Sequence, residues 1–329
     1  MVNNSNITSS LLVIDYKDKK GERLYMSNNT ILENLNNCNI CPRNCNADRT
    51  SSKLGICKSS SNLKVAKAYP HLWEEPCISG ENGSGTVFFS NCNLNCVFCQ
   101  NHEISHEAVG KEISTQRLSE IFLELQENGC HNINLVNPSH YALQIVEGIK
   151  LARKNGLKIP IAYNSNGYEK VETLKALEGY IQIYIPDLKY FDDKYSVKYS
   201  KAPNYFNIAS EAITEMVRQI GEPEFDENGI MKKGVIIRHL MLPGLLFDSK
   251  KIVDYIYKTF GDSVYLSLMN QYTPMYGAKD FPEINKPLNP KHYDSLIDHC
   301  LDIGYKNAFI QESGTSSEVY VPDFNLSGV

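Results

Sequence analysis

Three cysteines are closely spaced in the segment NCNLNCVFCQN, which contains Cys92, Cys96 and Cys99 in a C-x3-C-x2-C arrangement. No fourth cysteine follows directly, so the kind of metal centre is the first question. A structural zinc ion normally takes four protein ligands, and here it would need a distant fourth ligand such as His102 or Cys77. A [4Fe–4S] cluster held by three thiolates would keep one iron open for a ligand from outside the protein. The spacing indicates a metal centre and leaves both kinds open.

A second group of cysteines precedes this segment. The sequences CNICPRNC and GIC supply Cys38, Cys41, Cys45 and Cys57, in C-x2-C-x3-C-x11-C spacing. Four thiols in a short region with few apolar residues predict a metal centre that holds the region together. Zn²⁺ often binds through two C-x2-C pairs, and only one is present, whereas a Cys-Pro step occurs in ferredoxin-type sequences. We therefore favour an auxiliary [4Fe–4S] cluster, with Zn²⁺ as the alternative.

The composition indicates a reducing compartment for both groups. The chain has 329 residues, ten cysteines and a net charge of −5. Its first residues lack the pattern of a secretion signal, and no apolar run approaches the ~18 residues of a membrane span. We therefore expect a cytoplasmic protein with no membrane partner, in which clustered cysteines bind metal and the isolated Cys130 and Cys300 are buried thiols. The acidic balance also argues against a nucleic-acid partner.

The chain after residue 85 alternates between apolar strands and amphipathic helices. The expected strands span residues 86–90, 132–136, 159–163, 181–185, 234–240 and 264–269, with a strand-like segment at 307–311. The expected helices span residues 115–128, 141–155, 171–179, 207–220, 249–260 and 290–303. This order predicts an α/β fold with a parallel sheet and right-handed crossovers, wound into an open or partial barrel.

The same pattern divides the chain into four parts. We expect an N-terminal lead-in at residues 1–37 and a small, irregular, cysteine-rich metal-binding module at residues 38–85. The barrel is expected at residues 86–311, followed by a C-terminal tail at residues 312–329.

Polar residues follow the second to sixth expected strands. Because the carboxyl ends of parallel strands meet at one edge of a sheet, these residues should gather at the same mouth as the loop of Cys92. They are residues 137–140 (NPSH), residues 164–166 (NSN), Asp187 and Lys189, Arg238 and His239, and residues 270–272 (NQY). Each could instead cap a helix or a turn, but five polar loops at one edge favour a ligand site.

Most of the chain resembles the radical S-adenosylmethionine (radical SAM) enzymes, whose signature is C-x3-C-x2-C after the first strand of a βα array. The resemblance is close to a branch related to pyruvate formate-lyase activating enzyme, in HLWEEPCISGENGSGTVFFSNCNLNCVFCQNHEIS, NINLVNPSHY, YNSNGYE, IQIYIPDLKYFD, GVIIRHLMLPG and LMNQYTP. It covers residues 38–311. It implies a partial (β/α)6 barrel of the radical SAM type, whose three cysteines hold a [4Fe–4S] cluster with SAM on the open iron.

The resemblance also implies roles for residues at the strand ends. Asn137, Pro138 and Ser139 occupy the place of a Gly-Gly-Glu segment that holds the SAM amino group in many relatives. This sequence departs from that pattern, so backbone carbonyls are expected to serve there. Asp187 and Lys189 match a D-x-K element whose lysine lies near the SAM carboxylate or the substrate. The other expected cofactor or substrate contacts are Asn164, His239 and Gln271.

The implied reaction is the reductive cleavage of SAM to a 5′-deoxyadenosyl radical, which takes a hydrogen atom from a substrate. A glycine of a glycyl radical enzyme is our first hypothesis for that substrate, because glycine has no side chain to block close approach. A low-potential cluster also requires a reductant such as flavodoxin or ferredoxin. Two alternatives remain. The same chemistry could act on a small metabolite or another peptide, or the chain could be a non-enzymatic iron–sulfur electron-transfer or metal-binding protein.

Overall fold

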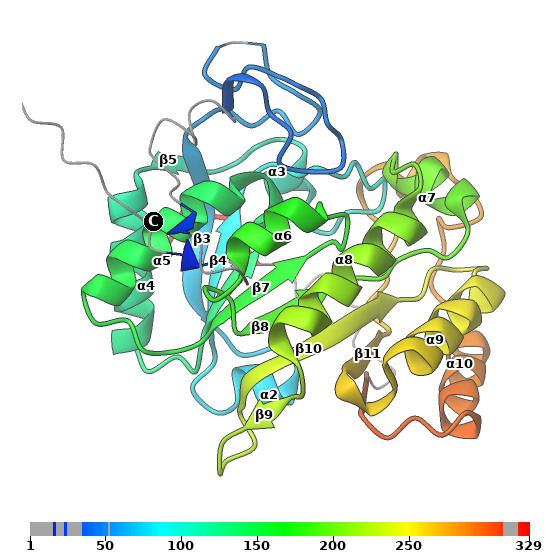
Figure 1. Ribbon diagram of the computed structural model, residues 1–329. Helices are drawn as coiled ribbons and strands as arrows, with labels where there is room; N and C mark the ends of the chain where they lie inside the picture. Colours follow the sequence, from blue (N-terminus) through cyan, green and yellow to red (C-terminus); the bar gives the residue numbers. More distant parts are fainter. Residues whose placement is uncertain (1–15, 18–22, 25–34, 52, 312–321) are drawn as a thin grey trace, which may run out of the picture.

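The structure, a computed structural model, describes residues 16–17, 23–24, 35–51, 53–311 and 322–329 (Figure 1). Its main feature is a ten-stranded sheet. The parallel strands are β4 (Ser84–Phe89), β6 (Ile133–Val136), β7 (Ile161–Ser165), β8 (Ile183–Pro186), β10 (Met231–Leu240), β11 (Tyr265–Met269) and β12 (Ala308–Ile310). They neighbour one another in this order across the sheet. The predicted α/β fold with a parallel sheet is therefore confirmed.

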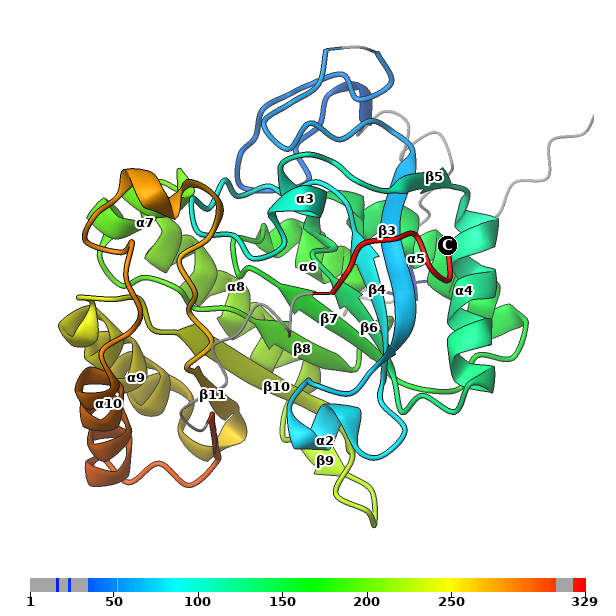
Figure 2. The ribbon, with the colours of Figure 1, turned by 180° about the vertical axis from the view of Figure 1, so that it is seen from behind.

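Helices connect these strands and cover one face of the sheet, as the two opposite views show (Figures 1 and 2). They are α4 (Thr115–Glu127), α5 (Ala142–Lys154), α6 (Val171–Leu177), α7 (Asp193–Ser200), α8 (Tyr205–Ile220), α9 (Leu246–Phe260) and α10 (Pro290–Asp302). The short helices α2 (Pro76–Ser79) and α3 (His102–Ser105) lie within connections. Six of the long helices were expected from the sequence, and α7 was not.

Local signals explain where several helices begin and end. At the start of α4 the Ser114 side chain accepts a hydrogen bond from a first-turn N–H, and Asn289 does the same for α10, whose first residue is Pro290. Gly129 and Gly156 follow α4 and α5 with φ of +83° and +103°. A residue without a Cβ adopts this left-handed conformation without strain, so the chain can leave each helix there.

The strands present different side chains to their two faces, as the pleat requires. On β4 and β6, Phe89 and Leu135 belong to the large core beneath the helices. Phe88 and Val136 point to the opposite face, where they line a cavity. The sheet therefore separates a packed helical layer from the lumen of a partial barrel.

One antiparallel strand extends the sheet beyond its expected first strand. β3 (Leu63–His71) pairs with β4 on one side and with β5 (Lys111–Ile113) on the other. The main sheet therefore begins at residue 63 and not at residue 86, and only the first part of the predicted cysteine-rich module is irregular. Pro70 and the lysines within LKVAKAYPH obscured the strand pattern.

The described part of the C-terminal tail packs along β3 (Figure 2). The Ala68 N–H donates to the Ser327 carbonyl at 3.0 Å. Phe324 is buried, and its ring lies 5.5 Å from that of Phe88. Phe324 therefore packs beside Phe88, while Ser327 and Gly328 continue along the edge of β3 toward α4.

The predicted N-terminal lead-in falls largely outside the described residues. Its described part includes β1 (Tyr16–Lys17) and β2 (Arg23–Leu24), which form a short antiparallel pair. β9 (Glu224–Phe225) pairs with β10 and completes the main sheet.

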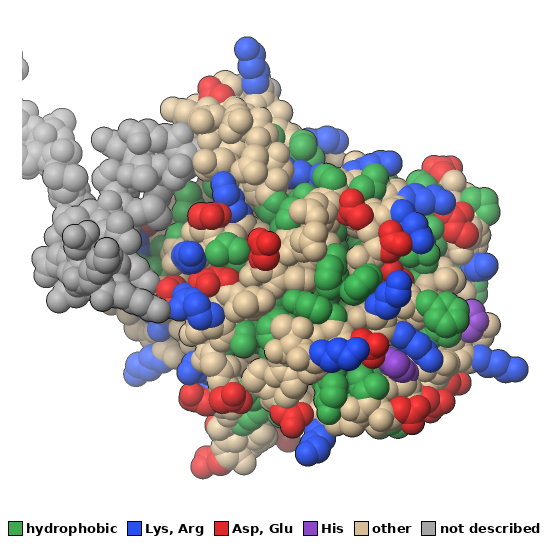
Figure 3. Space-filling model, turned by 45° about the vertical axis from the view of Figure 1, so that its right-hand side comes forward, with side chains coloured by type: hydrophobic (Ala, Val, Ile, Leu, Met, Phe, Trp, Pro, Cys, Tyr) green, Lys and Arg blue, Asp and Glu red, His purple; other side chains and the backbone are tan. Residues whose placement is uncertain are grey.

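Surface charge and helix hydropathy bear on the partners that were expected to be absent. Among the described residues, no helix is long and apolar enough to cross a membrane. On the face shown in Figure 3, acidic and basic side chains are interspersed.

The contact of the C-terminal segment with β3 generates a stability prediction. Phe324→Ala should lower the free energy of unfolding by about 3 kcal/mol, because it removes a buried ring and leaves a cavity beside Phe88. Phe247→Ala is the matched control, since Phe247 is 78% exposed. Its effect should stay within about 0.5 kcal/mol. Chemical denaturation measures both, and equal effects would show that the segment does not stabilise the fold.

Candidate active site

A cavity of about 740 Å³ occupies the face of the sheet opposite the helices. Side chains from β4, β6, β7, β10, β11 and β12, and from the connections after several of them, line it. Its wall also includes the segment His71–Pro76, which continues from β3. The topology therefore brings strand ends that are far apart in the sequence to one chamber, as expected of parallel strands.

The three cysteines of the predicted cluster loop all line this cavity. Cys92, Cys96 and Cys99 are each partly exposed to it. The loop is fixed to the C-terminal end of α7, because the Asn95 N–H donates to the Ser200 carbonyl at 3.1 Å and the Val97 N–H donates to the Tyr199 carbonyl at 2.9 Å. The sulfur atoms are therefore presented at the cavity wall by a braced backbone.

Polar groups surround the sulfur atoms. The Leu94 N–H lies 3.3 Å from Cys92 Sγ, and the Asn166 amide lies 3.5 Å from the same atom. The Ser200 hydroxyl lies 3.0 Å from Cys96 Sγ. Donors of this kind stabilise negative charge on sulfur and tune the potential of an iron–sulfur centre.

The electrostatics of the loop favour a bound metal centre. Burial raises the pKa of all three thiols, that of Cys99 to about 11, so without a metal each would keep its proton at neutral pH. Lys189 and Arg43 oppose this effect at Cys96, because both cations lower its pKa. A coordinated metal removes the thiol proton outright, and these two cations would then neutralise part of the thiolate charge.

The residues of the loop fit a [4Fe–4S] cluster. Arg43 Nη2 is buried and has no hydrogen-bond partner among the described residues, so a donor is available beside an anionic group. The described residues include no three or more His, Cys, Asp or Glu side chains in the geometry of a single-ion site. A four-iron cube does not require that geometry, because its ligands surround a larger body than one ion. Cys92, Cys96 and Cys99 are the residues that would hold it.

Five of the eight predicted cofactor contacts line the cavity with the cysteines. They are Asn137, Asn164, Asp187, Lys189 and Gln271. Each comes from the end of a different strand or its connection, except that Asp187 and Lys189 form an ion pair after β8. These five residues therefore lie at one cavity wall, as the convergence of parallel strand ends predicts, and their contact with a cofactor stays a prediction.

The other three predicted contacts do not reach the cavity. His239 follows Arg238 on β10 and points to the opposite face of the sheet. Its Nδ1 atom lies 2.8 Å from the Leu188 carbonyl oxygen. Burial lowers the pKa of the His239 imidazole to about 4. Pro138 and Ser139 are buried behind the strand end, and Ser139 begins a short 3-10 turn. The side chains of these three residues are not placed to contact a ligand in the cavity.

The inner end of the cavity contains a charged cluster that the sequence did not reveal. Arg238 Nε donates to Glu75 Oε1 at 2.8 Å, and Arg238 Nη2 contacts both Glu74 and Glu75. The second oxygen of Glu74 accepts from the Asn134 amide at 2.9 Å. Two carboxylates face one guanidinium, so this wall of the cavity is polar and has excess negative charge. Glu74 and Glu75 follow β3, which pairs with β4 and β5 and not with β10, so strand order alone does not place them beside Arg238.

The second cysteine group lies outside this cavity, in the irregular region at the top of Figure 1. Cys38 and Ala47 form an isolated bridge, and Cys41 is buried beside Cys38 and Cys57, with its pKa raised to about 12 chiefly by burial. Cys45 Sγ occupies the space beside Gly55, where an added Cβ would come within 2.5 Å of the sulfur. The fold therefore gathers all four predicted cysteines in one small region.

The remaining cysteines are buried thiols, as predicted. Cys130 and Cys300 lie beneath the helices. Cys77 is buried in α2, at the end of the molecule opposite the second cysteine group (Figure 1). It does not line the cavity with Cys92, Cys96 and Cys99, for which the sequence offered it as a distant zinc ligand.

Glu169 is a buried carboxyl behind the cavity wall that the sequence did not single out. It accepts hydrogen bonds from the Ser139 hydroxyl and, at 3.4 Å, from the Tyr163 hydroxyl. Burial raises its pKa to about 7, although these hydroxyl contacts lower it. Glu169 therefore joins the connections after β6 and β7 and fixes the backbone on which Asn137 and Asn166 lie.

Comparisons with known proteins agree with the cysteine loop and the parallel sheet. A model of the Radical SAM superfamily matches residues 86–256. The uncharacterized protein MJ0674 of Methanocaldococcus jannaschii is 30% identical over 272 residues, which are 80% of this chain and 73% of that protein.

Solved structures are similar to parts of this chain. SuiB of Streptococcus suis bound to S-adenosylmethionine is similar over 68% of this chain, with 16% identity and a TM-score of 0.47, and the chain spans 49% of the length of SuiB. Methylornithine synthase (PylB) is similar over 74% of this chain and 73% of its own, with 15% identity and a TM-score of 0.46.

The burial of Glu169 generates a pH prediction. Its folded pKa of about 7 exceeds the ordinary value of 4.5, so the folded state binds more protons between these values and loses stability as pH rises through them. The loss should be on the order of 3 kcal/mol. Glu169→Gln should abolish this pH-dependent part of the unfolding free energy. The measurement is chemical denaturation of the variant and the parent protein from pH 4.5 to 7.5, with their unfolding free energies compared at each pH.

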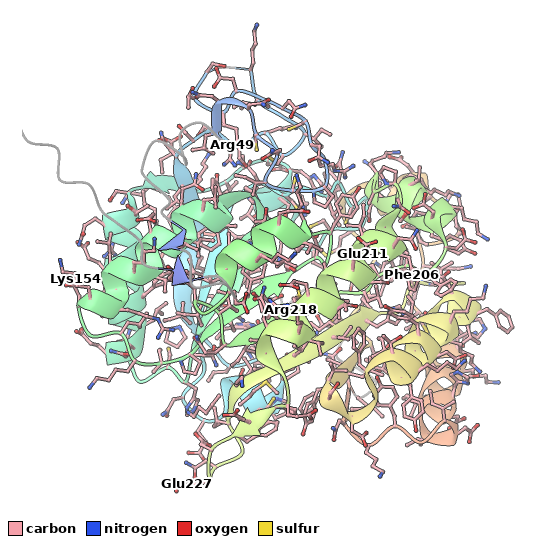
Figure 4. All side chains as sticks on the ribbon, in the orientation of Figure 1. Arg49, Lys154, Phe206, Glu211, Arg218 and Glu227 are labelled. Atoms are coloured by element: carbon pink, nitrogen blue, oxygen red, sulfur yellow. The ribbon has the colours of Figure 1, made fainter. Side chains whose placement is uncertain are left out.

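The exposed Glu211→Gln is the matched control, and its effect on unfolding should be constant over the same range (Figure 4). A difference between the parent and Glu169→Gln that does not change with pH would contradict the interpretation.

Proposed function

Because the chain belongs to the radical SAM superfamily, we propose that it cleaves SAM in the cavity at the strand ends and activates a glycyl radical enzyme. The observation that supports this proposal is the convergence of Cys92, Cys96 and Cys99 with polar strand-end residues around one chamber. When bound, the [4Fe–4S] cluster and SAM supply one-electron reductive cleavage and a radical that removes a hydrogen atom from the substrate.

The residues of this chain would bind and orient these groups. Lys189 is fixed by Asp187 and faces the cysteine loop, so its ammonium group is suited to pair with a carboxylate in the cavity. Asn137 donates to the Asn91 carbonyl and so joins the end of β6 to the start of the cysteine loop. Phe88, Leu94 and Met269 are among the apolar residues of the wall. They would exclude water from a reactive radical.

The glycyl-radical role is supported by the resemblance of HLWEEPCISGENGSGTVFFSNCNLNCVFCQNHEIS and the later segments to the activating-enzyme branch. Glycine is also a physically suitable target, because the flanking amide groups stabilise a radical at its Cα. The test is EPR spectroscopy of candidate glycyl radical enzymes from the same genome, mixed with this protein, SAM and reductant. A glycyl radical signal supports the role, and its absence on every candidate rejects it.

A second candidate substrate is a small polar metabolite or another peptide. The charged cluster of Glu74, Glu75 and Arg238 favours it, because a polar wall with excess negative charge suits a ligand with amino or hydroxyl groups. Consumption of such a compound with formation of 5′-deoxyadenosine, in the absence of any protein substrate, would identify this alternative.

Further components complete the proposal. We propose that a second metal centre, an auxiliary [4Fe–4S] cluster or Zn²⁺, is held by Cys38, Cys41, Cys45 and Cys57. We also propose that the protein works in the cytoplasm, with flavodoxin or ferredoxin as its reductant. The position of Cys41 beside Cys38 and Cys57 supports the second centre, because clustered cysteines in a reducing compartment are typical of metal sites.

The cluster loop generates a direct prediction. Cys96→Ala should abolish formation of 5′-deoxyadenosine from SAM and dithionite after anaerobic reconstitution, since the open cluster site is lost while the core beneath the helices is untouched. Cys130→Ala, at a buried thiol outside both groups, is the control and should retain iron content and cleavage. Cleavage of SAM by Cys96→Ala at the rate of the control would refute the assignment.

A further inference from the structure

The side chain of Arg43, which lies between Cys41 and Cys45 in the sequence, connects the irregular cysteine-rich region to the SAM-cluster loop. Arg43 Nε donates to the Asn93 carbonyl at 2.8 Å, and Nη1 donates to the Lys201 carbonyl. Its guanidinium also lies 5.2 Å from the centre of the Tyr168 ring.

Both backbone acceptors are next to residues that contact the cluster cysteines. Asn93 follows Cys92, and its side chain bonds to the Asn166 amide, which itself reaches Cys92 Sγ. Lys201 follows Ser200, whose hydroxyl lies 3.0 Å from Cys96 Sγ. Arg43 therefore supports the backbone behind two of the three cluster ligands from a separate region of the chain.

Arg43 is also a permanent charge at this position. An arginine side chain is a guanidinium cation, and the contacts with the Asn93 and Lys201 carbonyls place this cation behind the loop of Cys92 and Cys96. Its Nη2 is buried without an acceptor among the described residues. A cation beside an iron–sulfur cluster stabilises the reduced form, which has one more negative charge.

The base of the region that presents Arg43 is joined to the rest of the fold, because Leu35 and Ile40 are buried in the main core and the Thr173 hydroxyl donates to the Ile40 carbonyl at 2.6 Å. The turn from Cys41 to Cys45, which contains Arg43, has little regular structure of its own. Among residues 35–51 and 53–62, which the structure describes, regular pairing is limited to the bridge of Cys38 with Ala47. Arg49 anchors the base of this region, where it donates to the Ser60 carbonyl and to the His140 carbonyl (Figure 4). The loop that contains Arg43 lies between the four gathered cysteines. A metal bound by these cysteines would therefore fix the backbone conformation of that loop.

We propose that the metal held by Cys38, Cys41, Cys45 and Cys57 is a structural control element, which holds Arg43 against the SAM-cluster loop and thereby raises the reduction potential of the SAM cluster. This inference rests on the proposed function for the existence of both centres. It differs from an electron-relay role, in which the second centre would pass electrons and leave the equilibrium potential of the first unchanged.

The test is a redox titration of the anaerobically reconstituted full-length protein, followed by EPR. The signal that changes on addition of SAM identifies the cluster of Cys92, Cys96 and Cys99. Arg43→Met should shift its midpoint to a more negative potential, because the reduced cluster loses a stabilising cation. Arg43→Lys keeps the charge and loses the two-point backbone contact, so its midpoint should lie between those of Arg43→Met and the parent.

Cys41→Ser should remove one metal centre and shift the SAM-responsive midpoint in the same negative direction. The sign is diagnostic, because a centre with four thiolates is anionic and its loss by direct electrostatics alone would shift the potential the other way. The midpoint potential of the double variant Arg43→Met, Cys41→Ser should shift no further than that of the single variant with the larger shift. The reason is that both substitutions remove the same interaction, between Arg43 and the SAM-cluster loop.

Lys170→Met is the matched control, because Lys170 also contacts this region, at the Asn39 carbonyl, but has no contact with the cluster loop. Its midpoint should equal that of the parent. An unchanged or more positive midpoint in Cys41→Ser, or additive shifts in the double variant, would overturn the proposal. Unchanged metal content in Cys41→Ser would reject the second metal centre itself. Failure of the parent protein to cleave SAM would reject the proposed function, and the midpoint potentials of the cluster would still be measurable.

Discussion

The burial of three thiols at one edge of a parallel sheet is the constraint on which the rest of the structure depends. In an apolar environment a thiol keeps its proton, and a set of three thiolates would repel one another. A bound metal centre offsets the negative charge of the thiolates, and the surroundings of the loop are arranged for the charge that remains. Lys189 approaches from the strand ends and Arg43 from the cysteine-rich region, so two cations from different parts of the chain act on Cys96.

The parallel sheet provides the frame for this arrangement. Its pleat sends Phe89 and Leu135 into the core beneath the helices and leaves Phe88 and Val136 for the lumen. The lumen is apolar near these residues and charged at its inner end, where Arg238 meets two glutamates. A substrate in this chamber would therefore have one end near the cysteine loop and another near a polar wall. This division is suited to holding a reactive carbon in place while water is excluded.

The sequence was sufficient for the features that local spacing or topology determines. The C-x3-C-x2-C motif is local, and the rule for parallel strand ends found Asn137, Asn164 and Gln271 on the cavity wall. His239 was misplaced because adjacent strand residues point to opposite faces, and Arg238 takes the lumen side. Arg43 and Glu74 could not be found in this way. Their partners are distant in sequence and meet them only through β3 and an irregular region that no hydrophobic pattern describes.

The central claim is that SAM supplies the ligand that the three-cysteine loop lacks. Pulsed EPR of the reduced protein with SAM labelled with ¹⁵N at its amino group measures this directly. The account predicts a hyperfine coupling between the labelled nitrogen and the cluster held by Cys92, Cys96 and Cys99. A reduced cluster that shows no coupling to labelled SAM, while SAM is bound, would contradict it.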